Sequence, residues 1–333
     1  MSGHVDSGAL LLYNRFEGIA GDSMDYFRFL YDKYQRESAI ASLRRGGMSW
    51  EEFCSVNRPV LNGMERVQLR SGADEGVMYY AVHEENSRRV CDVPSCGYYF
   101  SSEKALSLLF TGLSDAVMKG GDTLFRIHLC AHDTAAQRLF SMMQFGFMAE
   151  KGLMRTTDAP PAREELFLIR TLTKQEIAAK WSEIWGCTRE IIRHLAQAPV
   201  FYPGTEFTEQ VYRAFYMDEG TSVHAAFSES DAIIGIIETN EDACSFLSPS
   251  VGSVNIGEIY VPPERRQTGL SQALLAYAAR YEEKRGKDYL WLEHGTANPN
   301  ARGFWNKYFG TYEYELVREV KSVREDEFPA YLP

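Results

Sequence analysis

The chain has 333 residues, of which 45% are hydrophobic and 24% are charged, and its formal net charge at pH 7 is −11. A chain of this length exceeds one hydrophobic core of ordinary size, so two domains are expected. The negative charge disfavours nucleic acid and anionic membranes as partners, because its long-range field opposes both, and it is compatible with a cationic substrate.

Cysteine usage and the lack of long apolar runs predict a cytoplasmic protein. The cysteines are sparse, and Cys91 and Cys96 have no second pair that would complete a zinc site, so buried reduced thiols without a metal are expected. No run reaches the length of a membrane span. Residues 9–12 are too short for the apolar part of a secretory signal.

Apolar periodicity and turn residues predict the elements of the first half of the chain. Helices are expected at 25–34, 39–45, 102–118 and 134–145, and strands at 66–70, 77–82, 89–93, 124–129 and 147–155. Residues 156–163, TTDAPPAR, are interpreted as a linker because Pro160 and Pro161 end the preceding element. A first domain of residues 1–160 follows.

The second half is interpreted as a domain of residues 165–333. Strands are expected at 166–170, 222–227, 232–238, 255–261, 289–294 and 312–320, with helical segments at 174–197, from 270 onward and at 298–309. Comparison of the halves reveals an internal repeat. LFRIHLCAHDTAAQRLF lies over YLWLEHGTANPNARGFW and pairs, at a constant offset, Asp133 with Asn298, Ala136 with Ala301 and Phe140 with Trp305. The repeat predicts two copies of one fold.

The most informative stretch is YVPPERRQTGLSQALL, residues 260–275. A strand ends at Pro262, a short basic loop follows, and an amphipathic helix opens directly after Gly269. The first N–H groups of a helix have no partners within it, and the helix dipole places positive potential there. With Gly269 admitting close approach and Arg266 adding charge, this stretch predicts an anion site.

The pattern Arg-x-x-Gly-x-Ser at residues 266–271 resembles motif A of the GNAT superfamily of acyl-CoA-dependent N-acyltransferases, Arg/Gln-x-x-Gly-x-Gly/Ala, with Ser271 as a small departure. The preceding Glu258-Ile259-Tyr260-Val261-x-Pro matches the strand that leads into that motif. The resemblance implies that acetyl-CoA is the co-substrate and that the loop holds its pyrophosphate. The residues implied in coenzyme binding are Tyr260, Val261, Arg266, Gln267, Thr268, Gly269, Leu270 and Ser271.

Residues 298–305, NPNARGFW, resemble motif B of the same family, Asn-x-x-Ala-x-x-Phe-Tyr. Asn298 is expected to cap the helix, with Pro299 in its first turn, and the resemblance adds a contact to the pantetheine arm. The family's frequent Tyr, which protonates the leaving thiolate, is Trp305 here, and an indole cannot do that. Tyr308, one turn on, is either a substitute acid or a core aromatic.

Glu258 is the candidate general base. Strand alternation is expected to place it with Ile256 and Tyr260 on an apolar face that raises its pKa, which suits removal of a proton from an ammonium. The alternative is an ion-paired carboxylate. Gly257 is expected to mark a β-bulge, and the freed N–H groups near Val261 would then polarise the thioester carbonyl.

His132 and Asp133 are adjacent, and Asp133 is expected to be a helix cap rather than a catalytic partner of His132. His294, at the end of its strand near the expected cleft, is expected to be structural.

The expected fold is α/β (α+β), with two tandem GNAT-like domains, each a mixed, mostly antiparallel sheet flanked by helices. The first would be a degenerate copy, because residues 100–105, FSSEKA, offer no Gly to a pyrophosphate and Glu103 would repel it.

The second domain would transfer an acetyl group to a primary amine of a small molecule or peptide by direct attack. The alternatives are a non-catalytic acetyl-CoA-binding sensor or scaffold, and a tandem GNAT-fold aminoacyltransferase that uses charged tRNA. The sequence leaves the acceptor and the oligomeric state open.

Overall fold

The computed structural model describes residues 26–40, 48–85, 87–161, 166–197, 207–241 and 253–322. The chain divides into two compact units, one of Met1–Gly146 with Glu315–Pro333 and one of Phe147–Tyr314. This division lies within strand β6 (Gly146–Arg155), whereas the sequence placed the boundary at 160–165. β6 falls in the second unit because it pairs antiparallel with β11 (Tyr289–Gly295), from Ala149 to Arg155. Both the predicted linker and the predicted helix at 39–45 lie partly outside the described residues.

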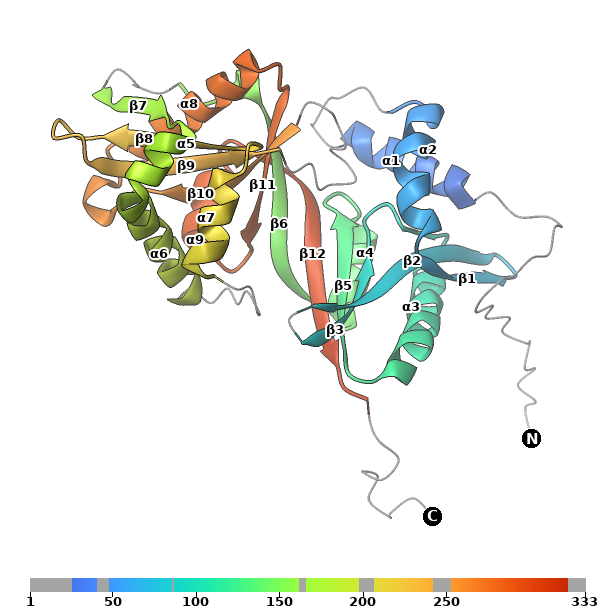
Figure 1. Cartoon of the computed structure of the whole chain (residues 1–333). Helices are drawn as coiled ribbons and strands as arrows, with labels where there is room; N and C mark the ends of the chain where they lie inside the picture. Colours follow the sequence, from blue (N-terminus) through green and yellow to red (C-terminus); the bar gives the residue numbers. More distant parts are fainter. Residues whose placement is uncertain are drawn as a thin grey trace, which may run out of the picture. The chain divides into compact units, whose positions relative to one another are not determined.

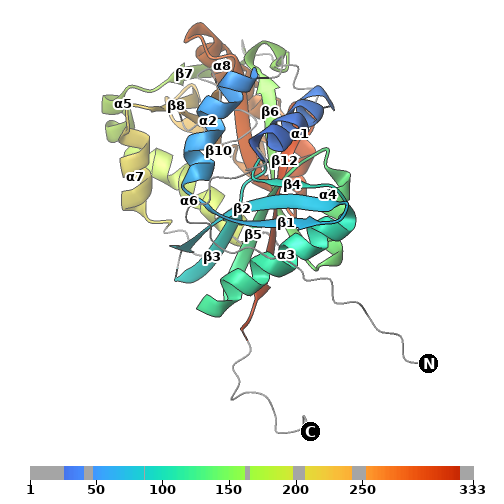
Figure 2. The ribbon, with the colours of Figure 1, turned by 90° about the vertical axis from the view of Figure 1, so that its right-hand side faces the viewer.

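The first unit combines a mixed sheet with helices. Its helices are α1 (Tyr26–Ile40), α2 (Trp50–Asn62), α3 (Glu103–Val117) and α4 (Thr134–Met142), with a 3-10 turn η1 (Met118–Gly120). Its strands are β1 (Glu65–Ser71), β2 (Asp74–Glu85), β3 (Arg88–Val93), β4 (Tyr98–Phe100), β5 (Thr123–Cys130) and the end of β12 (Gly310–Val320). β2 pairs antiparallel with β1, β3 and β4, and β3 pairs parallel with β5. In Figure 2, α3 lies along β1 and β2.

The second unit has helices on both faces of its sheet (Figure 1). Its helices are α5 (Lys174–Ala179), α6 (Trp181–Gln197), α7 (Glu209–Met217), α8 (Leu270–Lys284) and α9 (Pro299–Trp305), with 3-10 turns η2 (Thr156–Asp158) and η4 (Pro263–Arg265). Besides β6, β11 and the start of β12, its strands are β7 (Leu168–Thr171), β8 (Thr221–Phe227), β9 (Ile233–Asn240) and β10 (Ser253–Tyr260). β7, β8, β9 and β10 pair antiparallel in chain order. β10 pairs parallel with β11, and α8 connects these two strands.

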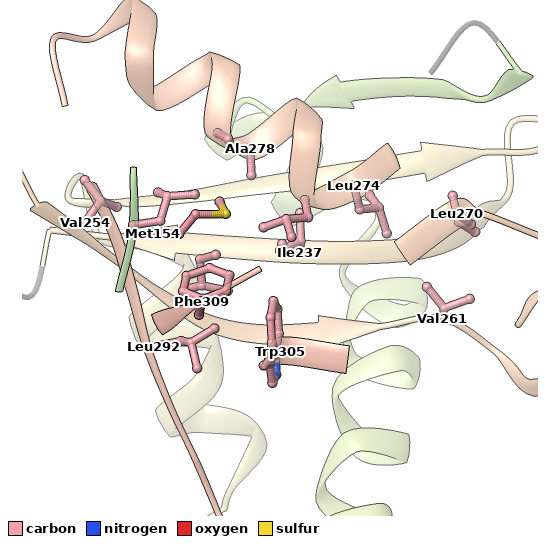
Figure 3. Close-up of a cluster of buried hydrophobic side chains, with 14 of the residues drawn as sticks. Met154, Ile237, Val254, Val261, Leu270, Leu274, Ala278, Leu292, Trp305 and Phe309 are labelled. Atoms are coloured by element: carbon pink, nitrogen blue, oxygen red, sulfur yellow. The ribbon is translucent and has the colours of Figure 1, made fainter. Parts of the chain in front are cut away.

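Successive side chains of the central strands point alternately into the two hydrophobic cores of this unit, one on each face of the sheet. Ile237 packs with Leu270 and Leu274 of α8, whereas its neighbour Ile236 packs with Trp181 of α6 and Tyr216 of α7. Figure 3 shows the α8 core, in which Trp305 and Phe309 belong to the same buried cluster as Leu274 and Ile237. The pattern follows from the two-residue period of a strand, which sends successive side chains to opposite faces.

His224 of β8 is buried between two threonine hydroxyls of this unit. Its Nδ1 lies 2.9 Å from the Thr171 hydroxyl and its Nε2 lies 3.4 Å from the Thr239 hydroxyl. Burial, aided by the charge of Arg285, lowers the pKa of His224 to about 3. The imidazole is therefore neutral in the folded protein at neutral pH.

We expect His224 to make the protein acid-sensitive. The folded pKa lies below the ordinary 6.5, so the unfolded chain binds one more proton between pH 6.5 and 3, and stability is lost as pH falls through this window. Relative to His224→Gln, wild type should lose about 1.4 kcal/mol of unfolding free energy per pH unit there. Urea unfolding of both proteins at pH 6.5, 5.5 and 4.5 measures the difference, and parallel curves would contradict it. Buried carboxyls elsewhere act equally on both proteins and cancel.

Among the described residues, no helix is long and apolar enough to cross a membrane.

Candidate active site

A cavity of about 640 Å³ opens in the second unit where two parallel strands part. β10 and β11 pair only from Ser253 with Tyr289 to Ile256 with Leu292. Beyond this point β10 and β11 both line the cavity, together with α6 and the starts of α8 and α9. The residues used below are Glu258, Tyr260, Val261, Arg266, Ser271, His194, His294 and Asn298.

A β-bulge shapes the β10 wall of the cavity, which confirms the expectation for Gly257. The pairing of β10 with β9 shifts between Ile256–Thr239 and Ile259–Ile237, so that Gly257 and Glu258 together oppose Glu238. The extra residue also corrects the predicted face. Ile256 packs in the α8 core and Tyr260 packs against the α6–α7 core, so Glu258 does not share a face with Ile256.

Glu258 lines the cavity and is only partly exposed. Its Oε1 accepts a hydrogen bond from the Tyr212 hydroxyl of α7 at 3.2 Å. Burial raises the pKa of Glu258 to about 7, against the opposing effect of the Tyr212 hydrogen bond. A carboxyl with this pKa can take a proton near neutral pH, as a general base must. No ion-pair partner of Glu258 is found among the described residues.

A second carboxyl lies behind the bulge. Glu238 of β9 is 0% exposed, its Oε2 accepts the N–H of Glu258 at 3.2 Å, and its Oε1 accepts from the Asn240 amide at 2.8 Å. Burial, together with the charge of Glu258, raises the pKa of Glu238 to about 8. Sequence reasoning missed both Glu238 and Tyr212. The available signal for Glu238 was a single carboxylate ending the apolar strand IIGIIE.

The basic loop has the backbone expected of an anion site. Gln267 and Gly269 adopt left-handed conformations, with φ of 63° and 89°, and α8 begins after Gly269 without any side-chain cap. The helix-start N–H groups are thus left without a side-chain acceptor. Arg266 and Ser271 line the cavity, and the Arg266 Nε donates to the Val261 carbonyl at 3.3 Å.

The other residues of the loop have local roles. Leu270 is buried in the α8 core, and the Thr268 hydroxyl donates to the Arg265 carbonyl at 2.6 Å. Gln267 and Thr268 are exposed, and none of Gln267, Thr268, Gly269 and Leu270 lines the cavity.

Asn298 caps α9, as expected. Its side-chain oxygen accepts from the N–H groups of Asn300 and Ala301, both at 3.2 Å, and its amide nitrogen lies 3.3 Å from His194 Nε2 of α6. Asn298 is 5% exposed and lines the cavity. The predicted cap is confirmed, and the contact to His194 adds a link from α9 to α6.

Tyr308 does not reach the cavity. It follows the end of α9, its hydroxyl accepts from the Gln272 amide of α8 at 2.7 Å, and its ring packs on Phe304. Trp305 is buried in the α8 core while also lining the cavity. The structure therefore does not bring Tyr308 together with Glu258, and the core-aromatic interpretation describes its position.

The two remaining histidine motifs behave differently. Asp133 caps α4 by accepting the Ala136 N–H at 3.0 Å, as expected, and no bond joins it to His132. His294 is buried and lies 3.2 Å from the Asn306 side-chain oxygen, but it also lines the cavity. Among the described residues, no group of three or more His, Cys, Asp or Glu side chains could hold a metal ion.

The part of the chain that contains this site is similar to a known protein family. Residues 189–311 match the model of the acetyltransferase (GNAT) family. A GCN5-related N-acetyltransferase from Sphaerobacter thermophilus shares the fold at 14% identity, over 89% of this chain and 92% of that chain, with a TM-score of 0.56.

A second solved structure is less similar. A glucosamine N-acetyltransferase region of a fungal multi-domain GH3 beta-N-acetylglucosaminidase is 10% identical, over 96% of this chain and 39% of that chain, with a TM-score of 0.50. No curated protein matches the sequence. These findings confirm the GNAT acetyltransferase resemblance for residues 189–311 and the GNAT-like α/β fold.

Proposed function

We propose that the second unit transfers an acetyl group from acetyl-CoA to a primary amine of a small molecule or peptide by direct attack. The observation that carries this proposal is that one cavity contains both Glu258, a carboxyl of raised pKa, and Arg266 and Ser271 from the loop at the start of α8. We further propose that the protein acts in the cytoplasm, without nucleic-acid or membrane partners, in keeping with its net charge of −11.

In the proposed reaction, Glu258 accepts a proton from the acceptor ammonium. The freed amine attacks the thioester carbonyl, the C–N bond forms, the C–S bond breaks, and the second proton of the nitrogen neutralises the departing thiolate. The N–H groups at the start of α8 and Arg266 would hold the pyrophosphate. A thiolate is a good leaving group, so the proposal needs no tyrosine acid. Thiol release from acetyl-CoA over a panel of amines tests it, and no release with any amine would refute acetyl transfer.

Coenzyme A affinity should depend on Gly269. An alanine at φ of 89° is strained, and the strain distorts the turn that presents the helix-start N–H groups. We expect Gly269→Ala to weaken coenzyme A binding at least tenfold in calorimetry. Gly286→Ala is the matched control, because Gly286 lies after the other end of α8 at φ of 80° with no atom within 4 Å of an added Cβ. Equal affinities of the two variants would contradict the proposed cradle.

We propose that the first unit is a degenerate copy of the second. Both units join two parallel strands through a helix, β3 to β5 through α3 and β10 to β11 through α8, and both continue into a helix capped by Asp133 or Asn298. The start of α3 differs from that of α8, since the Ser102 hydroxyl accepts the Ala105 N–H and Glu103 occupies the first turn. Its N-terminus is therefore already capped and acidic, which disfavours a phosphate.

Lys33 occupies the position in the first unit that corresponds to the cavity. Its Nζ reaches the Ser95 carbonyl after β3 at 3.3 Å and the Cys130 sulfur at the end of β5 at 4.0 Å. It also lies 3.7 Å from the Asp133 carboxylate. The side chain thus bridges the ends of two parallel strands whose counterparts in the second unit part around the cavity. This supports coenzyme binding in the second unit alone.

The alternative is a protein that binds acetyl-CoA without transferring its acetyl group. The position of Tyr308 outside the cavity and the indole of Trp305 favour it, because neither offers a phenol to the leaving thiolate. Coenzyme A binding without thiol release, over the same panel of amines, would support this sensor or scaffold function.

A further inference from the structure

The bulge next to Glu258 leaves a backbone N–H that is satisfied by a side chain instead of by the sheet ladder. Because Gly257 and Glu258 together oppose a single residue of β9, the ladder cannot pair every N–H of β10 there. The N–H of Glu258 instead donates to Glu238 Oε2 at 3.2 Å. A buried N–H without an acceptor is costly, so this contact stabilises the bulged conformation.

The carboxyl group of Glu238 is also fixed from its other side. Its Oε1 accepts the Asn240 amide at 2.8 Å, and that amide lies 3.1 Å from the Asn255 oxygen of β10. Glu238 is 0% exposed and does not line the cavity. It therefore cannot touch a bound acceptor.

Gly257 provides the room that this carboxylate needs. A Cβ at residue 257 would lie 2.6 Å from each Glu238 oxygen, closer than carbon and oxygen can approach without displacement. The strand and the carboxylate thus fit together only because residue 257 has no side chain.

We propose that Glu238 is the positioning residue of this site: its carboxyl group fills the space beneath Gly257 and, by accepting the Glu258 N–H, holds the Glu258 side chain toward the cavity. This inference rests on the proposed acetyl transfer with Glu258 as base. The other groups that face the two carboxyls are the Tyr212 hydroxyl, which donates to Glu258, and Tyr216, buried on the same side.

The test compares kcat, KM for acetyl-CoA and coenzyme A affinity in variants of the full chain. Glu238→Ala should lower kcat about thirtyfold or more, and Gly257→Ala should have a similar effect because it displaces the same carboxylate. Coenzyme A affinity should stay within twofold of wild type in both, since the loop at the start of α8 is untouched. Glu238→Gln keeps one acceptor oxygen and should retain kcat within tenfold. Gly303→Ala, whose Cβ meets no atom within 4 Å, is the control and should match wild type.

The double variant gives the sharpest readout. Once Glu238→Ala has removed the carboxylate, an alanine at residue 257 has nothing to displace, so Gly257→Ala should change kcat less than twofold in that background. If the two substitutions lower kcat independently, so that their effects multiply in the double variant, the proposal is overturned. A Glu238→Ala protein with wild-type kcat also overturns it. If Glu238→Ala does not fold, Gly257→Ala alone is the test, and a folded Gly257→Ala protein with wild-type kcat overturns the proposal. A wild-type protein that releases no thiol would refute acetyl transfer instead, a separate outcome.

Discussion

Glu258→Gln should lower kcat/KM by about 100- to 1,000-fold while leaving coenzyme A affinity unchanged. General-base catalysis contributes on the order of 10²–10⁴ in rate, and the amide cannot accept the proton. The exchange is nearly isosteric, and the Gln oxygen can still accept from the Tyr212 hydroxyl, so the cavity should keep its shape. Steady-state thiol release measures the rate, and calorimetry measures the affinity.

The pH profile separates loss of the base from loss of structure. Glu258 must be unprotonated to act, and burial raises its pKa to about 7, so wild-type kcat/KM should rise with pH and level off above about 7. The rise of kcat/KM with pH should be absent in Glu258→Gln. Tyr212→Phe is the matched variant. It removes the hydrogen bond that favours the charged form of Glu258, so the rise should move to higher pH. Full activity of Glu258→Gln across neutral pH would exclude Glu258 as the base.

The parts of the site that depend on local chain geometry could be predicted from the sequence. Gly269 before an amphipathic helix, Asn298 before a proline, and Gly257 within a strand each follow from one or two neighbouring residues, and the structure has the expected turn, cap and bulge. Helix α2 was missed, since Pro59 within it lowers its helical signal.

The parts that depend on contacts between distant residues could not be predicted. Tyr212 and Glu238 lie 46 and 20 residues before Glu258, and only packing of α7 and β9 against β10 brings them together. The face of Glu258 was wrongly predicted for a related reason. A bulge changes strand alternation by one residue, and the sequence shows where a glycine lies but not on which side of it the register shifts.

Lys33→Met should destabilise the first unit by about 3 kcal/mol, because it leaves the Asp133 carboxylate buried without its cation. The side chains of Lys33 and Asp133 are only 8% and 11% exposed and lie 3.7 Å apart. The ammonium also lies 3.4 Å from the centre of the Tyr98 ring, and this contact is lost as well. Urea unfolding at neutral pH measures the loss.

A double-mutant cycle assigns that loss to the charge pair. Asn is as good a helix cap as Asp, so Lys33→Met/Asp133→Asn should keep α4 capped and recover much of the stability, because neither charge is then left alone. Asp32→Asn, which removes an exposed ion pair with Arg28 on the same helix, is the control and should cost less than about 1 kcal/mol. A Lys33→Met protein as stable as wild type would show that the ammonium is not held as the structure has it. Since we assign the coenzyme to the second unit, the folded variant should bind coenzyme A as wild type does, whereas a changed affinity would argue that the first unit is more than a degenerate copy.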